Sequence, residues 1–146
     1  MKFLFALVIV VSAISIGSSA INKDLAAKIM AVSQQCKEEY KVDDETFSKF
    51  MNFEKAPESE DGMCMVACYV KNMGYFHDGK FDMDVIKEGN RQKWDDNATV
   101  QLANEIAKDC IEKFGADDNE CHLAGRVLKC VFDNGYKGEL PKPQRT

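Results

Sequence analysis

The segment from residue 60 to residue 73 reads EDGMCMVACYVKNM and contains two of the six cysteines, Cys64 and Cys68. In a helix these two residues lie one turn apart on the same face. Gly74 follows at the place where a residue with a left-handed backbone commonly ends a helix. We therefore predict a helix over residues 60–73 whose cysteines bridge to other segments and not to each other.

The remainder of the chain also shows helical spacing of its apolar residues, for example Leu25, Ile29 and Val32 near the start. No segment alternates convincingly between apolar and polar residues, so the sequence predicts no sheet. The fold class is therefore all-α, a six-helix domain linked by disulfides. Five further helices are predicted. They cover residues 22–40, Asp43 or Asp44 through Met51, Asp82 to Gly89-Asn90, Asp95 or Asp96 to Phe114, and Asp118 or Asn119 to Asn134-Gly135. Residues 75–81 are predicted to form a loop or turn.

The N-terminus has the pattern of a secretory signal peptide. Lys2 is followed by the apolar run 3–16 and then by small residues up to Ala20. The run is shorter than the ~20 apolar residues that a membrane span needs, so we predict cleavage after Ala20. Residues 1–20 are then the signal peptide, and residues 21–146 form one extracellular, secreted domain that is not embedded in a membrane.

The charge of the chain argues against nucleic acid as a partner. The net charge is −5 for the whole sequence, and it becomes −6 when Lys2 is removed with the signal peptide. Phosphate backbones and anionic lipids repel an acidic domain of this kind. We therefore expect neither to bind.

Six cysteines in a secreted chain predict three disulfides. Six cysteines can pair in fifteen ways, and helix geometry removes some of them. Cys64 and Cys68 share one helix face, while Cys121 and Cys130 would lie roughly 13 Å apart along a helix axis. A disulfide needs Cα atoms within about 7 Å of each other. Excluding these two pairs leaves ten pairings open.

Catalytic and metal sites have weak support in the sequence. Cys121-His122 and the pair Cys64 and Cys68 suggest zinc ligands, but a second pair of cysteine or histidine ligands is missing and the compartment is oxidising. The Gly-x-Ser-x-Gly and His-Glu-x-x-His motifs and a phosphate-binding loop do not occur. Secreted phospholipases A2 share the helical, disulfide-rich composition, but their Cys-Cys-x-x-His-Asp motif is absent. We expect no enzyme activity, no cofactor and no metal.

The cysteine spacing resembles that of a known family. Cys36-x27-Cys64-x3-Cys68-x41-Cys110-x10-Cys121-x8-Cys130 is similar to the six-cysteine pattern of the insect odorant-binding proteins, which include pheromone-binding and general odorant-binding proteins. The passage from Cys68 to Asp82 resembles the segment after the third cysteine of that family. The resemblance covers essentially the whole mature chain. It implies the pairs Cys36 with Cys68, Cys64 with Cys121, and Cys110 with Cys130.

The resemblance also implies that the helices enclose an apolar cavity for small hydrophobic ligands. Each apolar residue, taken singly, fits ordinary core packing better than a cavity wall, and only the resemblance favours a cavity for the set. The tail carries Pro141 and Pro143, which oppose a further long helix, and we expect it to form a lid or wall through Tyr136 and Leu140. Either Tyr69 or Tyr136 could orient a polar group of the ligand. The candidate ligand-binding residues are Phe50, Val66, Tyr69, Met73, Phe76, Ile106, Phe114, Val127, Phe132 and Tyr136.

The implied function is extracellular binding and transport of an odorant, a pheromone or a similar small hydrophobic molecule. The implied partners are that ligand and a membrane odorant receptor, and the expected state is a monomer or weak homodimer. The alternative is a secreted carrier or effector outside olfaction, in saliva, venom or reproductive fluid, on the same scaffold.

Overall fold

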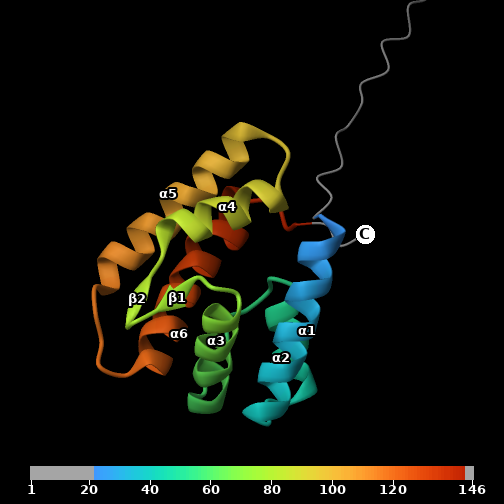
Figure 1. Ribbon diagram of the computed structural model, residues 1–146, viewed down its shortest axis with the longest axis vertical. Helices are drawn as coiled ribbons and strands as arrows, with labels where there is room; N and C mark the ends of the chain where they lie inside the picture. Colours follow the sequence, from blue (N-terminus) through green and yellow to red (C-terminus); the bar gives the residue numbers. More distant parts are fainter. Residues whose placement is uncertain (1–21, 144–146) are drawn as a thin grey trace, which may run out of the picture.

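The computed structural model describes residues 22–143, so the predicted signal peptide lies outside the described residues. Within them the predicted all-α fold with six α-helices is confirmed (Figure 1). A two-stranded hairpin and a terminal helical segment complete the domain. The elements are α1 (Lys23–Glu39), α2 (Asp44–Met51), α3 (Glu60–Asn72), β1 (Phe76–His77), β2 (Lys80–Phe81), α4 (Met83–Lys93), α5 (Asn97–Phe114), α6 (Glu120–Val131) and η1 (Phe132–Glu139).

A polar side chain caps the start of each α-helix, and the structure decides between the alternatives that the sequence left open. Asp43, and not its neighbour, caps α2 by accepting a hydrogen bond from the backbone of Thr46 at 2.8 Å. Asp96 caps α5 by accepting one from Thr99 at 2.7 Å, and Asn119 caps α6. Each cap satisfies an amide that the first turn of a helix otherwise leaves unpaired.

The predicted end of α4 at Gly89-Asn90 is wrong, because the helix continues to Lys93. Gly89 is a packing residue: a Cβ built there would lie 2.7 Å from the hydroxyl oxygen of Tyr75. Asn90 is buried, and its side-chain amide donates to the side-chain oxygen of Asn104 on α5 at 2.9 Å. Gly89 and Asn90, which resemble a helix C-terminus in the sequence, therefore lie inside α4 and contact neighbouring elements.

The prediction that residues 75–81 contain no strand is also wrong. Phe76 and His77 pair with Phe81 and Lys80 in a short antiparallel hairpin. Its two central residues are Asp78 and Gly79, and both have positive φ, 52° and 73°. An Asp-Gly pair of this kind is the sequence signature of a tight hairpin turn. Strands of two residues are too short for an alternating pattern to reveal them.

The C-terminal segment departs from the predicted stop at Asn134-Gly135. The α-helical winding ends at Val131 and continues as the wider η1, whose winding is interrupted at Gly138. The amide of Leu140 donates to the carbonyl of Gly135, five residues earlier, at 3.2 Å. Gly135 allows this return, because a Cβ built there would lie 2.7 Å from the Leu140 side chain.

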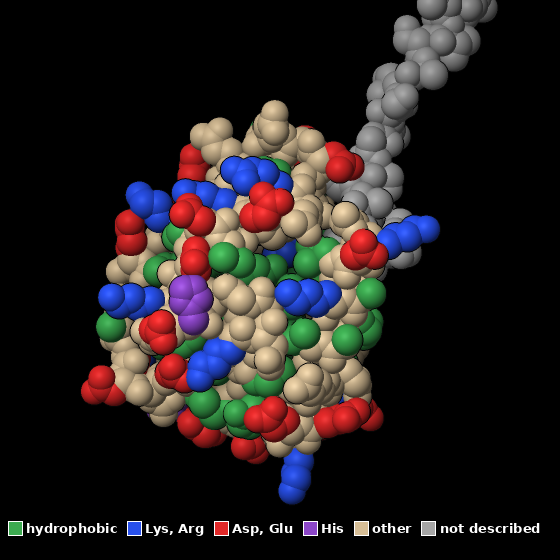
Figure 2. All heavy atoms as spheres, in the orientation of Figure 1, with side chains coloured by type: hydrophobic (Ala, Val, Ile, Leu, Met, Phe, Trp, Pro, Cys, Tyr) green, Lys and Arg blue, Asp and Glu red, His purple; other side chains and the backbone are tan. Residues whose placement is uncertain are grey.

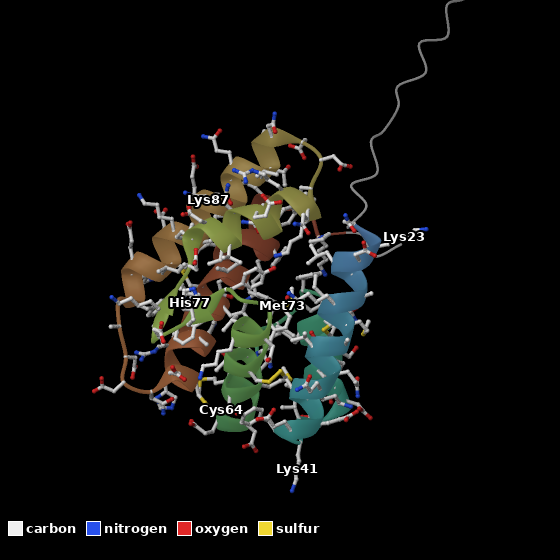
Figure 3. The ribbon with its side chains drawn as sticks, in the orientation of Figure 1. Lys23, Lys41, Cys64, Met73, His77 and Lys87 are labelled. Carbon is white, nitrogen blue, oxygen red and sulfur yellow. A yellow bond between two sulfur atoms is a disulfide. The ribbon has the colours of Figure 1, made fainter. Side chains whose placement is uncertain are left out.

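Helix α3 lies at the centre of the disulfide framework. In Figure 1, α1 and α2 lie on one side of α3, α6 lies on its other side behind the hairpin, and α4 and α5 cross the upper part of the domain. Figure 3 shows the disulfides as yellow bonds on either side of α3. The pairing is the one that the family resemblance implies: Cys36–Cys68 joins α1 to α3, Cys64–Cys121 joins α3 to α6, and Cys110–Cys130 joins α5 to α6.

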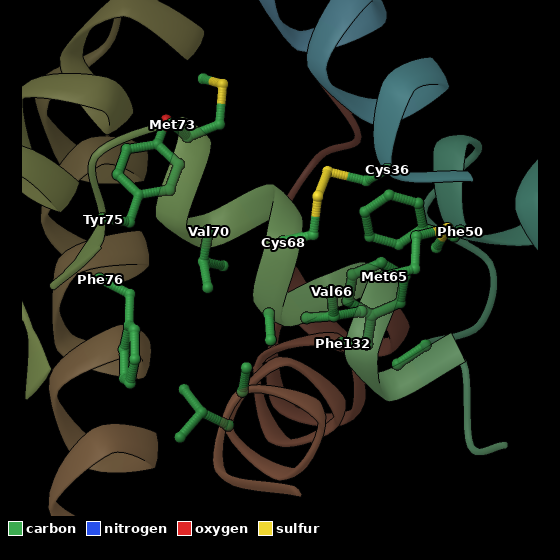
Figure 4. Close-up of a cluster of buried hydrophobic side chains, with 14 of the residues drawn as sticks. Cys36, Phe50, Met65, Val66, Cys68, Val70, Met73, Tyr75, Phe76 and Phe132 are labelled. Atoms are coloured by element: carbon green, nitrogen blue, oxygen red, sulfur yellow. A yellow bond between two sulfur atoms is a disulfide. The ribbon is translucent and has the colours of Figure 1, made fainter. Parts of the chain in front are cut away.

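The main core lies where α3 packs against its neighbours (Figure 4). Met65 and Val66 have no exposed surface, and Phe76 is 1% exposed. Helices α3 and α6 approach closely at Gly125, where a built Cβ would lie 2.4 Å from Cγ of Met63 and 2.9 Å from its Cβ. The glycine in α6 therefore makes room for the methionine of α3.

We predict that Gly125→Ala lowers the free energy of unfolding by about 1–3 kcal/mol through overpacking, although alanine is the better helix former by ~1 kcal/mol. Chemical denaturation of the oxidised protein measures the change. The double variant Met63→Ala/Gly125→Ala should lose less stability than the sum of the two single variants, because the added methyl group then has space. Additive losses would contradict the contact.

Candidate ligand-binding cavity

An apolar cavity of about 140 Å³ lies between the helices. A single water molecule needs only about 10–15 Å³ on the same measure, so the cavity is much larger than a packing defect. Its wall combines residues from all six α-helices, the hairpin and the C-terminal segment. The lining residues are Ala26, Ile29, Met30, Ser33, Phe50, Met51, Phe53, Tyr69, Val70, Tyr75, Phe81, Ile86, Asn90, Lys93, Trp94, Ala103, Ala107, Ile111, Ala124, Val127, Leu128, Val131, Phe132, Tyr136 and Leu140.

Five of the ten candidate ligand-binding residues line this cavity: Phe50, Tyr69, Val127, Phe132 and Tyr136. Four of them form an aromatic wall. The ring of Phe50 lies 5.6 Å from that of Tyr69 and 6.3 Å from that of Phe132, and Phe132 lies 5.3 Å from Tyr136. Figure 4 shows Phe50 and Phe132 near α3. Aromatic walls of this kind suit flat or elongated apolar ligands.

The other five candidate residues, Val66, Met73, Phe76, Ile106 and Phe114, are placed away from the cavity wall. The first three are buried in the main core, where Phe76 packs on Phe81 at 4.9 Å. Ile106 packs against the smaller core cluster formed by α4, α5 and the tail. Phe114 lies at the end of α5, next to two cationic side chains.

Two hydroxyl groups in the cavity wall have no hydrogen-bond partner among the described residues. Ser33 on α1 is 1% exposed, and Tyr75 after α3 is 8% exposed. The pattern of apolar residues does not indicate Ser33, because serine is polar; it places Val32 on the inner face of the helix instead. The spacing itself fits, since Ser33 follows Ile29 by four positions and precedes Cys36 by three. A buried hydroxyl without a partner costs free energy, so both are available to a ligand.

The extension of α4 brings two further residues to the wall that the sequence did not suggest. Lys93 is partly buried there, and burial lowers its pKa to about 8. The indole nitrogen of the following residue, Trp94, donates to the carbonyl of Pro141 at 3.2 Å. This hydrogen bond attaches the C-terminal tail to the end of α4, and the side chain of Leu140 is buried beside it.

The three tyrosines of the wall remain neutral at physiological pH. Burial raises the pKa of Tyr69, and the neighbouring Tyr75 and Tyr136 add to the effect. Burial is also the main cause of the raised pKa values of Tyr75 and Tyr136. Each phenol therefore keeps its proton and can donate a hydrogen bond to an oxygen of a ligand.

The two histidines of the chain, and the cysteines considered as zinc ligands, lie outside the cavity wall. His77 and His122 are on the surface, where their Nε2 atoms lie 3.1 Å from Asp82 and 2.8 Å from Glu60. Glu60 has an oxygen near the sulfur atoms of Cys64 and Cys121. Those sulfurs are joined in a disulfide, so neither is a thiolate that could bind zinc.

Comparison with known proteins identifies the family. The sequence model of the PBP/GOBP family matches residues 18–134, which is most of the chain. The chain belongs to the PBP/GOBP family. This identification confirms the resemblance to the insect odorant-binding and pheromone-binding proteins that the cysteine spacing predicts.

Solved structures agree with this assignment. An odorant-binding protein of Drosophila melanogaster, dmelOBP28a, has 26% sequence identity and a TM-score of 0.67, and the alignment covers 82% of this PBP/GOBP chain and 98% of that one. The pheromone-binding protein 3 of Epiphyas postvittana shares the fold, with a TM-score of 0.64 at 17% identity over 77% of this chain and 99% of that one. A search of curated proteins found no match. Among residues 22–143, every helix is too short or too polar to cross a bilayer.

We predict that filling the cavity abolishes ligand binding in this PBP/GOBP protein. Ala107 lines the cavity from α5 and is 7% exposed. Ala107→Phe should leave no detectable uptake of a fluorescent apolar probe, a loss of at least about tenfold, because the ring occupies space that the probe needs. Ala31→Phe, on the exposed side of α1, is the control and should bind normally. Equal probe binding by both variants would contradict a role for the cavity.

We further predict a late ionisation of the cavity tyrosines. In the variant Tyr40→Phe the remaining tyrosines are the three of the wall. Their phenolate absorbance should stay absent above the usual pKa of about 10 and appear only as the protein unfolds. Because the folded state keeps protons that the unfolded state loses, this contribution to stability is present below about pH 10 and falls as the pH rises further. Ionisation near pH 10 in the folded protein would show that the rings are solvated.

Proposed function

We propose that this protein is a secreted carrier that takes up small hydrophobic molecules, such as odorants or pheromones, and transports them through aqueous fluid to membrane receptors. The apolar cavity is the observation that carries the proposal. A close-packed core of this size would normally leave few voids larger than a water molecule. Here the helices are tied to one another around an open space of about 140 Å³.

The framework supports a carrier because it stabilises the protein without filling the interior. Each disulfide typically contributes about 2–4 kcal/mol by restricting the unfolded chain. The bridges tie α3 to α1 and α6, and α5 to α6, so the walls keep their positions when the cavity is empty. Disulfides and the signal-like N-terminus both fit an oxidising, extracellular environment.

The composition of the wall supports binding without catalysis. Apolar and aromatic side chains predominate. The polar groups are the hydroxyls of Ser33 and the tyrosines, the amide of Asn90, the amine of Lys93 and the indole N–H of Trp94, which is bonded to Pro141. Among the lining residues of the described part of the chain there are no paired carboxylates and no nucleophile beside a histidine. We therefore propose that the protein is not an enzyme, and that it acts as a monomer or weak homodimer.

The proposal predicts that the oxidised mature protein binds a fluorescent hydrophobic probe, and that volatile alcohols, esters and aldehydes displace it. We expect dissociation constants on the order of micromolar, typical of an apolar ligand held by few polar contacts. Displacement is measured at neutral and at acidic pH, which also shows whether acidification releases the ligand.

The control is the cavity-filled variant Ala107→Phe, which should neither take up the probe nor show displacement. If the wild-type protein with its three disulfides takes up no probe, the carrier proposal fails. The alternative, a secreted effector on the same scaffold, would then be the better explanation.

A further inference from the structure

Lys93 is a cation in an apolar wall. Its side chain comes from the last residue of α4 and lines the cavity between α4 and α1. The two helices meet there, since the amide of Asn22 donates to the carbonyl of Gln92 at 3.3 Å. Figure 2 shows hydrophobic side chains around a hollow between α4 and α1, with a Lys or Arg side chain set back among them.

The described residues supply no counter-ion for Lys93. No Asp or Glu oxygen of residues 22–143 forms an ion pair with its Nζ atom, although thirteen other ion pairs are formed by these residues. Among the acids close to it in sequence, Glu88 pairs with Arg91 at 2.9 Å, Asp96 caps α5, and Asp95 is exposed. Burial alone lowers the pKa of Lys93, with no contribution from a neighbouring carboxylate.

Aromatic rings give Lys93 only partial compensation. Nζ lies 5.6 Å from the ring centroid of Tyr75 and 6.0 Å from that of Trp94. Cation–π contacts at these distances are weaker than an ion pair in a site that excludes water. A partly desolvated ammonium group without an anion is therefore costly in the empty protein, and an anionic ligand would remove that cost.

A second donor lies on the same side of the cavity. The hydroxyl of Tyr75 approaches Gly89, which is one helical turn before Lys93 on the same face of α4. This hydroxyl is buried, keeps its proton and has no partner among the described residues. An ammonium group and a phenol on one wall match the two oxygens of a carboxylate.

We propose that the cavity selects ligands with a carboxylate at one end of an apolar chain, such as medium-chain fatty acids, and that Lys93 binds the carboxylate with help from Tyr75. The apolar chain then lies along the aromatic wall formed by Phe50, Tyr69, Phe132 and Tyr136. This inference rests on the proposed carrier function and specifies the ligand class of the same site.

The test compares dodecanoic acid with dodecan-1-ol, which has the same chain length and an uncharged head, as competitors of a neutral fluorescent probe. In the wild type at about pH 7 the acid should bind about tenfold or more tightly than the alcohol. Lys93→Met should remove that preference, because it weakens binding of the acid far more than binding of the alcohol: methionine keeps the apolar stem and loses the charge. Tyr75→Phe should weaken binding of dodecanoic acid by a few-fold.

A pH series adds a readout specific to the lysine. Lys93 loses its charge as the pH rises through about 8, so acid binding should weaken between about pH 7 and 9.5 while binding of the alcohol stays constant. Lys93→Arg should keep the preference for the acid and remove this pH dependence, because a guanidinium group stays charged. Lys87→Met is the matched control, since Lys87 is an exposed lysine on the same helix that pairs with Asp84.

The outcomes separate the two proposals. Selective loss of acid binding in Lys93→Met, with wild-type binding of both ligands in Lys87→Met, supports the inference. Equal affinity of acid and alcohol in the wild type, or the same loss in both lysine variants, overturns it and leaves the carrier function intact. If neither ligand displaces a bound probe, the inference is likewise overturned, whereas absence of probe uptake overturns the carrier function as well. Thermal unfolding of Lys93→Met should show unchanged or higher stability, so loss of folding does not confuse the result.

Discussion

The disulfide attachment of α3 to two neighbours is the constraint on which the rest of the structure depends. Cys64 and Cys68 lie one turn apart on α3, and their disulfides join it to α6 and to α1. Because Cys110–Cys130 joins α6 to α5, four of the six helices form one covalently connected frame. Apolar side chains inside an uncrosslinked bundle tend to collapse into any available space. The frame limits that collapse, and the interior keeps a cavity at the cost of some close packing.

The sequence predicts the helices and their disulfides well and the residues of the cavity wall less well. Helix periodicity and capping residues locate the helices, and Asp43, Asp96 and Asn119 cap them as the local chemistry requires. The same periodicity shows only that a side chain points inward. It does not distinguish Tyr69, which faces the cavity, from Val66, which faces close-packed core on the same helix.

The sequence did not predict the polar residues of the wall, for a different reason. Serine and lysine are usually exposed, so a count of apolar positions passes over Ser33 and Lys93. The end of α4 was placed too early because Gly89 and Asn90 resemble a helix stop, whereas they pack against Tyr75 and Asn104. A polar residue at a position where the helical spacing predicts an inward-facing side chain could have indicated both residues. Such a residue points to a binding role more directly than an apolar residue at the same position.

The C-terminal segment closes the cavity without belonging to the covalent frame. Phe132, Tyr136 and Leu140 all line the wall, yet they come after the last cysteine and are held by the wide winding of η1 and by the hydrogen bond from Trp94 to Pro141. Evolution can therefore lengthen, shorten or replace this tail without disturbing disulfide formation. A gene copy that differs only in its last few codons would keep the scaffold and acquire a differently shaped interior, which gives this fold a simple route to a new cavity shape.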